Sequence, residues 1–298
     1  MNIGFLDLGL APFGAPPSRT LAHTVEAAVR ADALGLERYW LAEHYAADCA
    51  WAYAAPLAMA LLARTRRIRV GTGGVLLNVH DPFRVACDAR LIAAMHPGRF
   101  ELGIGRGGAD PPWDEVVAPG VDDYATKVES LLAHLHPGTD CTSLDGGGAR
   151  AIPSDGEPPP VWVLGSGTGS TPIARRHRLA FGLSLFHGET LPPRPEVPGP
   201  FLLAVAGSCG ATRAQAERRL AAETLHFVPR VVGDATQCRE ALAALATRYG
   251  AESVMFVELV RDHGYRLDSL TALAEAAPTR PAGPPRGAGG AATGRSKC

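Results

Sequence analysis

Short apolar runs alternate along the chain with stretches whose apolar residues recur every three or four positions. The first pattern is typical of buried strands and the second of amphipathic helices packed on one face. The apolar runs predict eight strands, at Ile3–Leu8, Glu37–Ala42, Ile68–Thr72, Phe100–Ile104, Val161–Leu164, Phe181–Phe186, Phe201–Ala206 and Val254–Val260.

Helix signals stand between most of these strands. Helices are expected from about Thr20 to Gly35, from Pro56 to Arg64, from Asp81-Pro82 to Met95, from Tyr124 to Leu135, after Thr171-Pro172, and from Asp234, where Gln237 completes a capping box. Between the sixth and seventh strands stands GETLPPRPEVPGP, residues 188–200. Its five prolines exclude a regular helix.

Eight strands separated by helices favour an α/β fold, a single-domain (β/α)8 TIM barrel over residues 1–277 that lacks one outer helix at the proline-rich loop. An open, doubly wound sheet is the alternative, because alternation of strands and helices occurs in both. Residues 278–298, rich in proline, glycine and alanine, are predicted to be a disordered tail.

Composition narrows the function. The chain has 298 residues, is 46% hydrophobic and carries a formal net charge of −1, so it predicts a large core and no nucleic-acid or anionic-membrane partner. Six scattered cysteines without a CxxC pair indicate reduced thiols, and no metal site is expected. The first residues, MNIGFLDLGL, are typical of a strand and not of a signal peptide, and no apolar run is long enough to span a bilayer. A cytoplasmic protein is expected.

In a TIM barrel, function collects where the strands end. The predicted strand ends carry unusual residues, namely Glu43-His44-Tyr45, Gly73-Gly74, Gly105-Arg106-Gly107, Gly165 to Ser170, and His187. The stretch GSGTGSTP suits an anion, because its backbone N–H groups and hydroxyls can converge, with Arg106 supplying charge. A flexible glycine loop is the alternative. His44 is either structural or a proton-transfer group, and Gly73-Gly74 is either a tight corner or a place where something flat approaches closely.

Three stretches carry a family resemblance: WLAEHY (40–45), RIRVGTGGVLLNVHDPFRVACDARLIAAMHPGRFELGIGRG (67–107) and PPVWVLGSGTGST (159–171). Together they resemble the bacterial luciferase-like flavin-dependent monooxygenases, and in particular the branch that tailors bacterial natural products.

The resemblance implies a cofactor site and a reaction. Reduced FMN (FMNH2), delivered by a separate NAD(P)H:flavin reductase, would react with O2 to a flavin 4a-hydroperoxide that oxygenates a mid-sized organic molecule. His44 matches a histidine that assists chemistry at the flavin 4a-position. Gly73-Gly74 matches a bulge, often with a cis peptide bond, against the flavin ring. The residues matching the flavin and phosphate contacts are Gly105, Arg106, Ser166, Gly167 and Thr168.

Further expectations follow from the resemblance. Candidate substrate-pocket residues are Tyr45, Trp51, Tyr53, Trp113, Phe186 and His187, and relatives suggest a homodimer. Tyr45 stands where many relatives have a second histidine, and Cys87 replaces an acidic residue, so light emission from an aldehyde is not expected. Two alternatives stay open: a deazaflavin-dependent oxidoreductase that uses no oxygen, and a flavin-binding accessory protein without catalysis.

Overall fold

The computed structural model describes the chain except residues 108–110, 118–122, 137–149, 168 and 276–298, so the expected tail lies outside the described residues. The elements in chain order are β1 (Asn2–Asp7), α1 (Pro17–Ala33), β2 (Arg38–Leu41), α2 (Ala55–Arg64), β3 (Arg69–Thr72), β4 (Val75–Leu76), η1 (Leu77–Val79), α3 (Pro82–Met95), β5 (Phe100–Gly105), η2 (Trp113–Glu115), α4 (Tyr124–Leu135), β6 (Val161–Gly165), α5 (Thr171–His177), β7 (Ala180–Ser184), β8 (Phe201–Cys209), α6 (Arg213–Leu220), β9 (Val231–Gly233), α7 (Ala235–Tyr249), β10 (Ser253–Glu258) and α8 (His263–Glu275).

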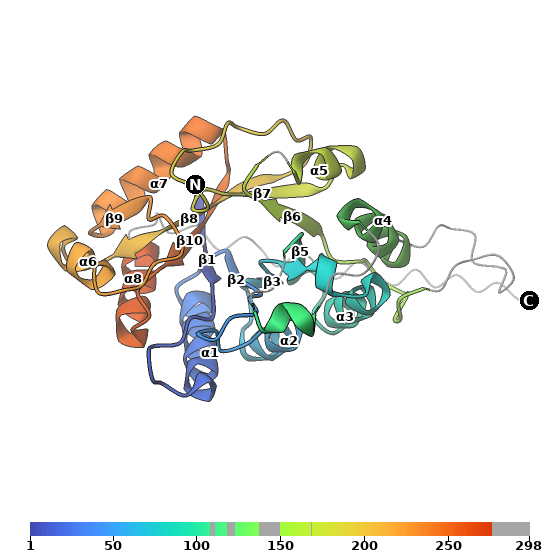
Figure 1. Ribbon diagram of the computed structural model, residues 1–298, viewed down its shortest axis with the longest axis horizontal. Coiled ribbons are helices and arrows are strands. Elements are labelled where there is room, and N and C mark those ends of the chain that lie inside the picture. The colour runs from blue at the N-terminus through green and yellow to red at the C-terminus, as the bar shows by residue number, and fades with distance from the viewer. Residues whose placement is uncertain (108–110, 118–122, 137–149, 168, 276–298) are drawn as a thin grey trace, which may run out of the picture.

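Eight parallel strands form a closed barrel. Their order is β1-β2-β3-β5-β6-β7-β8-β10, and β10 pairs with both β8 and β1 to complete the ring. The register joins Asn2 to Ser253, and Ser253 in turn to Leu202. In Figure 1 the strands occupy the centre and the helices lie outside them. The closing pairs exclude the open sheet and confirm the (β/α)8 barrel.

Residues 185–200, which connect β7 to β8, form no helix, as the five prolines predicted (Figure 1). The predicted caps also form: the Asp81 carboxylate accepts the backbone N–H of Arg84 at 2.9 Å, and Asp234 forms a capping box with Gln237. The short strands β4 and β9 and the helices α6 and α8 were not predicted. None of the helices in the described part of the chain is long and apolar enough to span a lipid bilayer.

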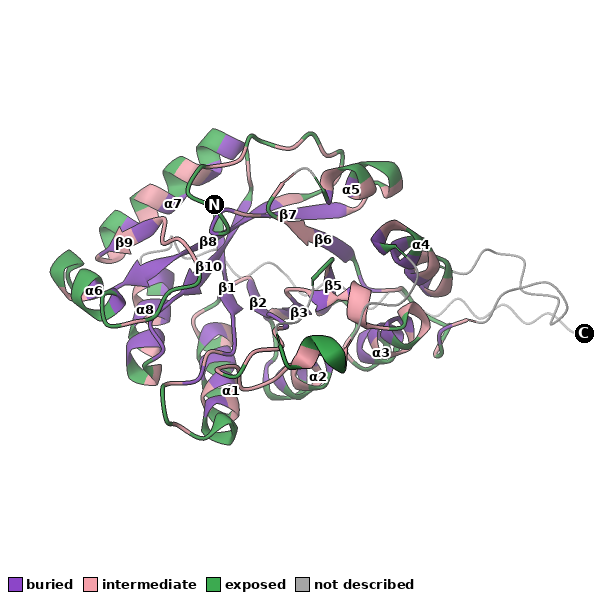
Figure 2. Cartoon of the chain, in the orientation of Figure 1, coloured by how far each residue is buried: buried purple, intermediate pink, exposed green. Residues whose placement is uncertain are grey.

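The core has two layers. Outward-facing strand residues such as Phe5 and Val70 pack under the helices, and Figure 2 shows the strands buried along their length while the helices expose their outer faces. Inward-facing residues fill the barrel, where the Trp40 and Trp162 rings meet edge to face at 5.4 Å. Below them, Glu101 accepts a hydrogen bond from the Trp40 indole at 2.8 Å. Side chains therefore fill the amino-terminal end of the barrel, and the cavity described below lies at the carboxyl ends of the strands.

Candidate active site

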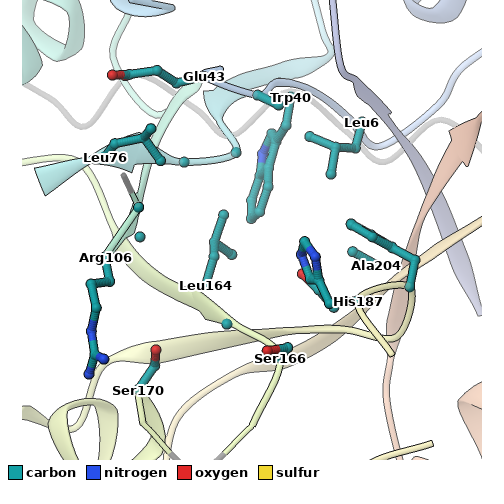
Figure 3. Close-up of a pocket in the computed structure, with 18 of the residues that line it drawn as sticks. Leu6, Trp40, Glu43, Leu76, Arg106, Leu164, Ser166, Ser170, His187 and Ala204 are labelled. Atoms are coloured by element: carbon teal, nitrogen blue, oxygen red, sulfur yellow. The ribbon is translucent and has the colours of Figure 1, made fainter. Parts of the chain in front are cut away.

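A cavity of about 710 Å³ opens at the carboxyl ends of the barrel strands (Figure 3). It lies where the segments that follow β2, β3, β5, β6 and β7 converge. The predicted site residues that it brings together are His44, Gly73, Gly74, Gly105, Arg106, Ser166, Gly167, Phe186 and His187. Thr168 lies outside the described residues. Within the described part of the chain, no group of three or more His, Cys, Asp or Glu side chains is placed to hold a metal ion.

Glycines form much of the cavity wall, because seven of its lining residues have no side chain. At Gly105 an added Cβ would meet no atom nearer than the Leu164 carbonyl oxygen at 4.0 Å. At Gly167, where φ is +155°, it would meet nothing within 4 Å. Side chains at these positions would occupy free space, and their absence leaves a smooth surface of backbone against which a flat group can lie.

The Gly73–Gly74 peptide bond is cis, as the resemblance led us to expect. An added Cβ at Gly73 would stand 2.6 Å from Leu6 Cδ1, and one at Gly74 would stand 2.9 Å from the carbonyl carbon of Gly103. Both residues also line the cavity. The glycine pair is therefore required by the neighbouring strands themselves, and it also keeps the cavity wall flat. The two interpretations of this stretch, a tight corner and a place where something flat can approach closely, are thus compatible.

One end of the cavity has the character of an anion site. Arg106 follows β5, and its guanidinium lies next to Gly169, where an added Cβ would be 3.3 Å from Nη2. Among the described residues Arg106 forms no ion pair, although Ser166 and Ser170 line the cavity with it (Figure 3). A guanidinium without a carboxylate partner retains its donors for an anionic ligand.

Tyr124, the first residue of α4, lies behind Arg106. The Arg106 guanidinium carbon is 6.0 Å from the Tyr124 ring centroid. Burial raises the pKa of Tyr124, and Arg106 lowers it. Its buried hydroxyl has no hydrogen-bond partner among the described residues. Sequence reasoning identified this tyrosine only as the start of a helix.

The opposite end of the cavity is aromatic. His44 and His187 both line it, as does Phe186. Phe227, from the segment between α6 and β9, packs against all three of their rings. Burial and then the charge of His44 lower the pKa of His187. Phe227 was not identified from the sequence, because it stands in a stretch without periodicity.

A buried acid–imidazole pair lies beside the cavity. Glu43 lines the cavity, and its Oε1 is 2.6 Å from His80 Nε2. The other oxygen, Oε2, is buried and has no partner in the described part of the chain. The Tyr45 hydroxyl lies 3.5 Å from the same His80 nitrogen. Burial and then Glu43 raise the pKa of Tyr45 to about 12.

Four expected pocket residues, Tyr45, Trp51, Tyr53 and Trp113, do not line the cavity. Tyr45 faces the Glu43–His80 pair, and the Tyr53 hydroxyl donates to Asp88 at 2.6 Å. The Trp51 indole donates to the Ala42 carbonyl at 2.8 Å. The physical reason is that the chain after β2 folds back towards β1, where Leu10 and Cys49 form a bridge, and so carries Trp51 away from the cavity. Trp113 lies in η2, half-buried.

Known proteins resemble this chain in sequence and in structure. A family model described as luciferase-like monooxygenase matches residues 1–191. The N-acetyl-S-alkylcysteine monooxygenase of Bacillus subtilis (strain 168) is 30% identical over 240 residues, 74% of this chain and 71% of that protein. The 4-hydroxyprotoasukamycin monooxygenase of Streptomyces nodosus subsp. asukaensis is 41% identical over 99 residues, 33% of this chain and 27% of that protein.

The crystal structure of apo-MsnO8 superposes with a TM-score of 0.80 at 28% identity and covers 92% of this chain and 97% of that one. The chain spans just over half the length of several curated relatives that it matches, since the alignments cover 54% to 56% of those proteins.

Proposed function

Because the chain belongs to the luciferase-like monooxygenase family, we propose that it is a flavin-dependent monooxygenase that takes reduced FMN and O2 and oxygenates a mid-sized organic molecule. The observation that carries this proposal is the cavity at the carboxyl ends of the strands, with a wall of glycine backbone and, at one end, a guanidinium that forms no ion pair with any described residue.

The residues present fit a flavin. The open space beside Gly105 and Gly167, where a Cβ would meet almost nothing, accommodates the edge of a flat ring system. Next to this space, Arg106, Ser166 and Ser170 provide a cation and two hydroxyls for a phosphate. We assign Gly73, Gly74, Gly105 and Gly167 to the ring and Arg106 and Ser166 to the phosphate, together with Thr168, which is proposed from the sequence alone.

Bound in reduced form, FMN supplies the two electrons with which one atom of O2 enters the substrate and the other leaves as water. The chain's own contribution is to hold, orient and shield. Apolar side chains, among them Leu6, Trp40 and Met255, close the floor of the cavity and keep water from it. His44, on the cavity wall, is the proposed proton-transfer residue, since imidazole exchanges protons near neutral pH.

FMN is preferred over a deazaflavin with an acidic tail. Within the described residues, the cavity wall contains Arg106 but no lysine and no second arginine, so only one phosphate-sized anion is matched by a cation.

The match to 4-hydroxyprotoasukamycin monooxygenase supports a natural-product substrate. A separate flavin reductase and a cytoplasmic location complete the proposal. The partly exposed Leu91 and Met95 on α3, at 46% and 58% exposure, support a homodimer.

Titration with FMN, followed by flavin fluorescence, tests the proposal. We expect saturable binding by the wild type and its loss in Gly105→Leu, because Gly105 lines the cavity and an added Cβ there meets no protein atom nearer than the Leu164 carbonyl oxygen at 4.0 Å. Thermal unfolding should be unchanged in this variant. Ala222→Leu, which introduces the same side chain at an exposed position, serves as the control.

Reaction of the wild type with reduced FMN and O2 should release hydrogen peroxide when no substrate is present. His44→Ala should change the rate of this release, whereas His23→Ala, on α1 outside the cavity, should not. Failure of FMN to bind the wild type at all would overturn the proposed function. Equal peroxide kinetics in wild type and His44→Ala would remove His44 from the reaction.

A further inference from the structure

Three rings, those of His44, Phe186 and His187, line the end of the cavity that lies opposite Arg106, and Phe227 packs against all three. His187 is 4.6 Å from Phe186 and 5.6 Å from Phe227, measured between ring centroids. Phe186 and Phe227 meet edge to face at 5.1 Å with an interplanar angle of 82°. The His44 ring is 6.2 Å from Phe227. The side chains come from three separate segments, and such a cluster presents ring faces and edges to whatever enters.

His187 is the polar side chain of this cluster whose ring nitrogens are available to a ligand. It lines the cavity and is exposed there, and neither nitrogen hydrogen-bonds to any residue that the structure describes. Burial and the neighbouring His44 lower its pKa, so the ring is neutral near pH 7. A neutral imidazole offers one nitrogen that accepts a hydrogen bond and one N–H that donates.

The surroundings restrict the occupant further. Leu164, Leu202, Ala204 and Met255 line the cavity at the level of the barrel interior, and Ser184 is the hydroxyl residue among the neighbours on β7. No lysine or arginine lines this end in the described part of the chain. A carboxylate or phosphate would lose hydration here without gaining a cation, and that loss is unfavourable. An occupant needs an apolar body and one neutral polar group.

Resting on the proposed function, we propose that this end is the substrate subsite and that the substrate is a flat aromatic molecule with a phenolic hydroxyl, which donates its O–H to His187. The ring of such a molecule packs against Phe186, which Phe227 contacts edge to face, while the hydroxyl reaches an imidazole nitrogen of His187 that has no hydrogen bond among the described residues. An alkyl chain would gain burial but would leave His187 unsatisfied. Phe227 acts in this subsite as a positioning residue, because it contacts the three rings that line the cavity.

Binding of three probes to the flavin-free chain tests the subsite: 1-naphthol, 1-methoxynaphthalene and naphthalene, by calorimetry. Only 1-naphthol can donate a hydrogen bond. We expect it to bind the wild type about tenfold more tightly than 1-methoxynaphthalene, which corresponds to one satisfied hydrogen bond. His187→Phe, which keeps a ring, should abolish this preference. Phe227→Ala should weaken the binding of all three probes. His23→Phe, outside the cavity, should behave as wild type.

FMN titrations run in parallel separate the two proposals. His187→Phe should bind FMN as the wild type does, which also shows that the variant is folded. If the wild type binds 1-naphthol and 1-methoxynaphthalene equally, or if the preference survives in His187→Phe, the phenolic subsite is overturned while the monooxygenase proposal stands. If FMN is not bound but the naphthol preference is found, the proposed function fails and the subsite remains.

Discussion

At the scale of single residues, the cavity is distinguished by polar groups that lack partners within the described chain. Among the residues that the structure describes, the guanidinium of Arg106 has no ion pair, and the hydroxyl of Tyr124 and the Oε2 atom of Glu43 have no hydrogen bond. Buried polar groups in folded proteins nearly always have partners. Arg106 differs from the other two because its side chain is exposed where it lines the cavity, so a ligand there can supply what the described part of the protein does not.

Replacing Arg106 tests its assignment to the phosphate. Arg106→Gln should weaken FMN binding roughly ten- to a hundredfold, because a charge-assisted hydrogen bond contributes about 1.5–3 kcal/mol. Riboflavin, which has the same ring and no phosphate, should bind the variant and the wild type alike. Fluorescence titration of both flavins measures the difference, with the exposed Arg84→Gln as control. An equal loss for FMN and riboflavin would place Arg106 at the ring instead.

Sequence reasoning found those site residues whose position is marked by the residues next to them in the chain. Glycines and Arg106 directly after an apolar run lie at strand ends, and strand ends meet in a barrel, so their convergence follows from the fold. Phe227 and the Glu43–His80 pair have no such signal. Glu43 and His80 are 37 residues apart, and their contact depends on how two connecting segments fold over the barrel. Tyr45 and Trp51 were misplaced for the same reason.

At the scale of elements, the Glu43–His80 pair joins two segments that form the cavity wall. Glu43 follows β2, and His80 follows η1, the helical turn after β4. The Glu43 side chain is wholly buried, whereas 19% of the His80 side chain is exposed. The Lys127 ammonium on α4 also donates to the backbone carbonyls of Asn78 and His80, at 2.6 and 3.2 Å. The segment that carries His80 is thus held from two sides.

The single substitution His80→Ala should destabilise the fold more than the double substitution Glu43→Gln/His80→Ala. His80→Ala leaves the Glu43 carboxylate buried without its partner, which should cost roughly 3 kcal/mol. In Glu43→Gln/His80→Ala the amide carries no charge, so part of that loss should be recovered. Urea unfolding of the two variants and of Glu43→Gln alone measures this. A double variant no more stable than His80→Ala would show that the pair is not held together by charge.

The element pattern was predictable where apolar periodicity was strong. All eight barrel strands were found to within a few residues, and the proline-rich connection was found from its composition. Helix α6 was missed because only Ala216 and Leu220 are buried on it, too few to make a periodic stripe. The two-residue strand β4 and the three-residue strand β9 are defined by their neighbours, β5 and β8, and not by their own sequence.

At the scale of the whole molecule, the barrel is closed by contacts between its two ends in sequence. The Asp7 carboxylate of β1 accepts hydrogen bonds from the Arg266 guanidinium of α8 at 2.5 Å and from the Tyr39 hydroxyl at 2.6 Å. On β10, the Glu258 carboxylate accepts from the Ser269 hydroxyl at 2.6 Å and from the Cys209 amide at 3.0 Å. Both carboxylates are buried, and their titration therefore affects the stability of the closed barrel.

The two carboxylates make the free energy of unfolding depend on pH in opposite directions. Burial raises the pKa of Asp7, but Arg266 and the hydrogen bonds from Tyr39 and Gly9 lower it below its ordinary value of 3.8 overall. Its contribution is present above that value and is lost as the pH falls through the lower folded pKa. Burial raises the pKa of Glu258 to about 7, although the hydrogen bonds from Ser269, Cys209 and Val260 lower it.

Folded Glu258 therefore keeps a proton that the unfolded chain releases above its ordinary pKa of 4.5. Because the native state binds more protons, stability should fall as the pH rises from about 4.5 to about 7, by roughly 3 kcal/mol from this group. Urea midpoints measured across this range should decline in the wild type and in the exposed control Glu252→Gln. Glu258→Gln, which does not titrate, should be less stable at pH 4.5 because it has lost an acceptor oxygen, but its decline should be much shallower. An equally steep decline in Glu258→Gln would assign the proton to another group.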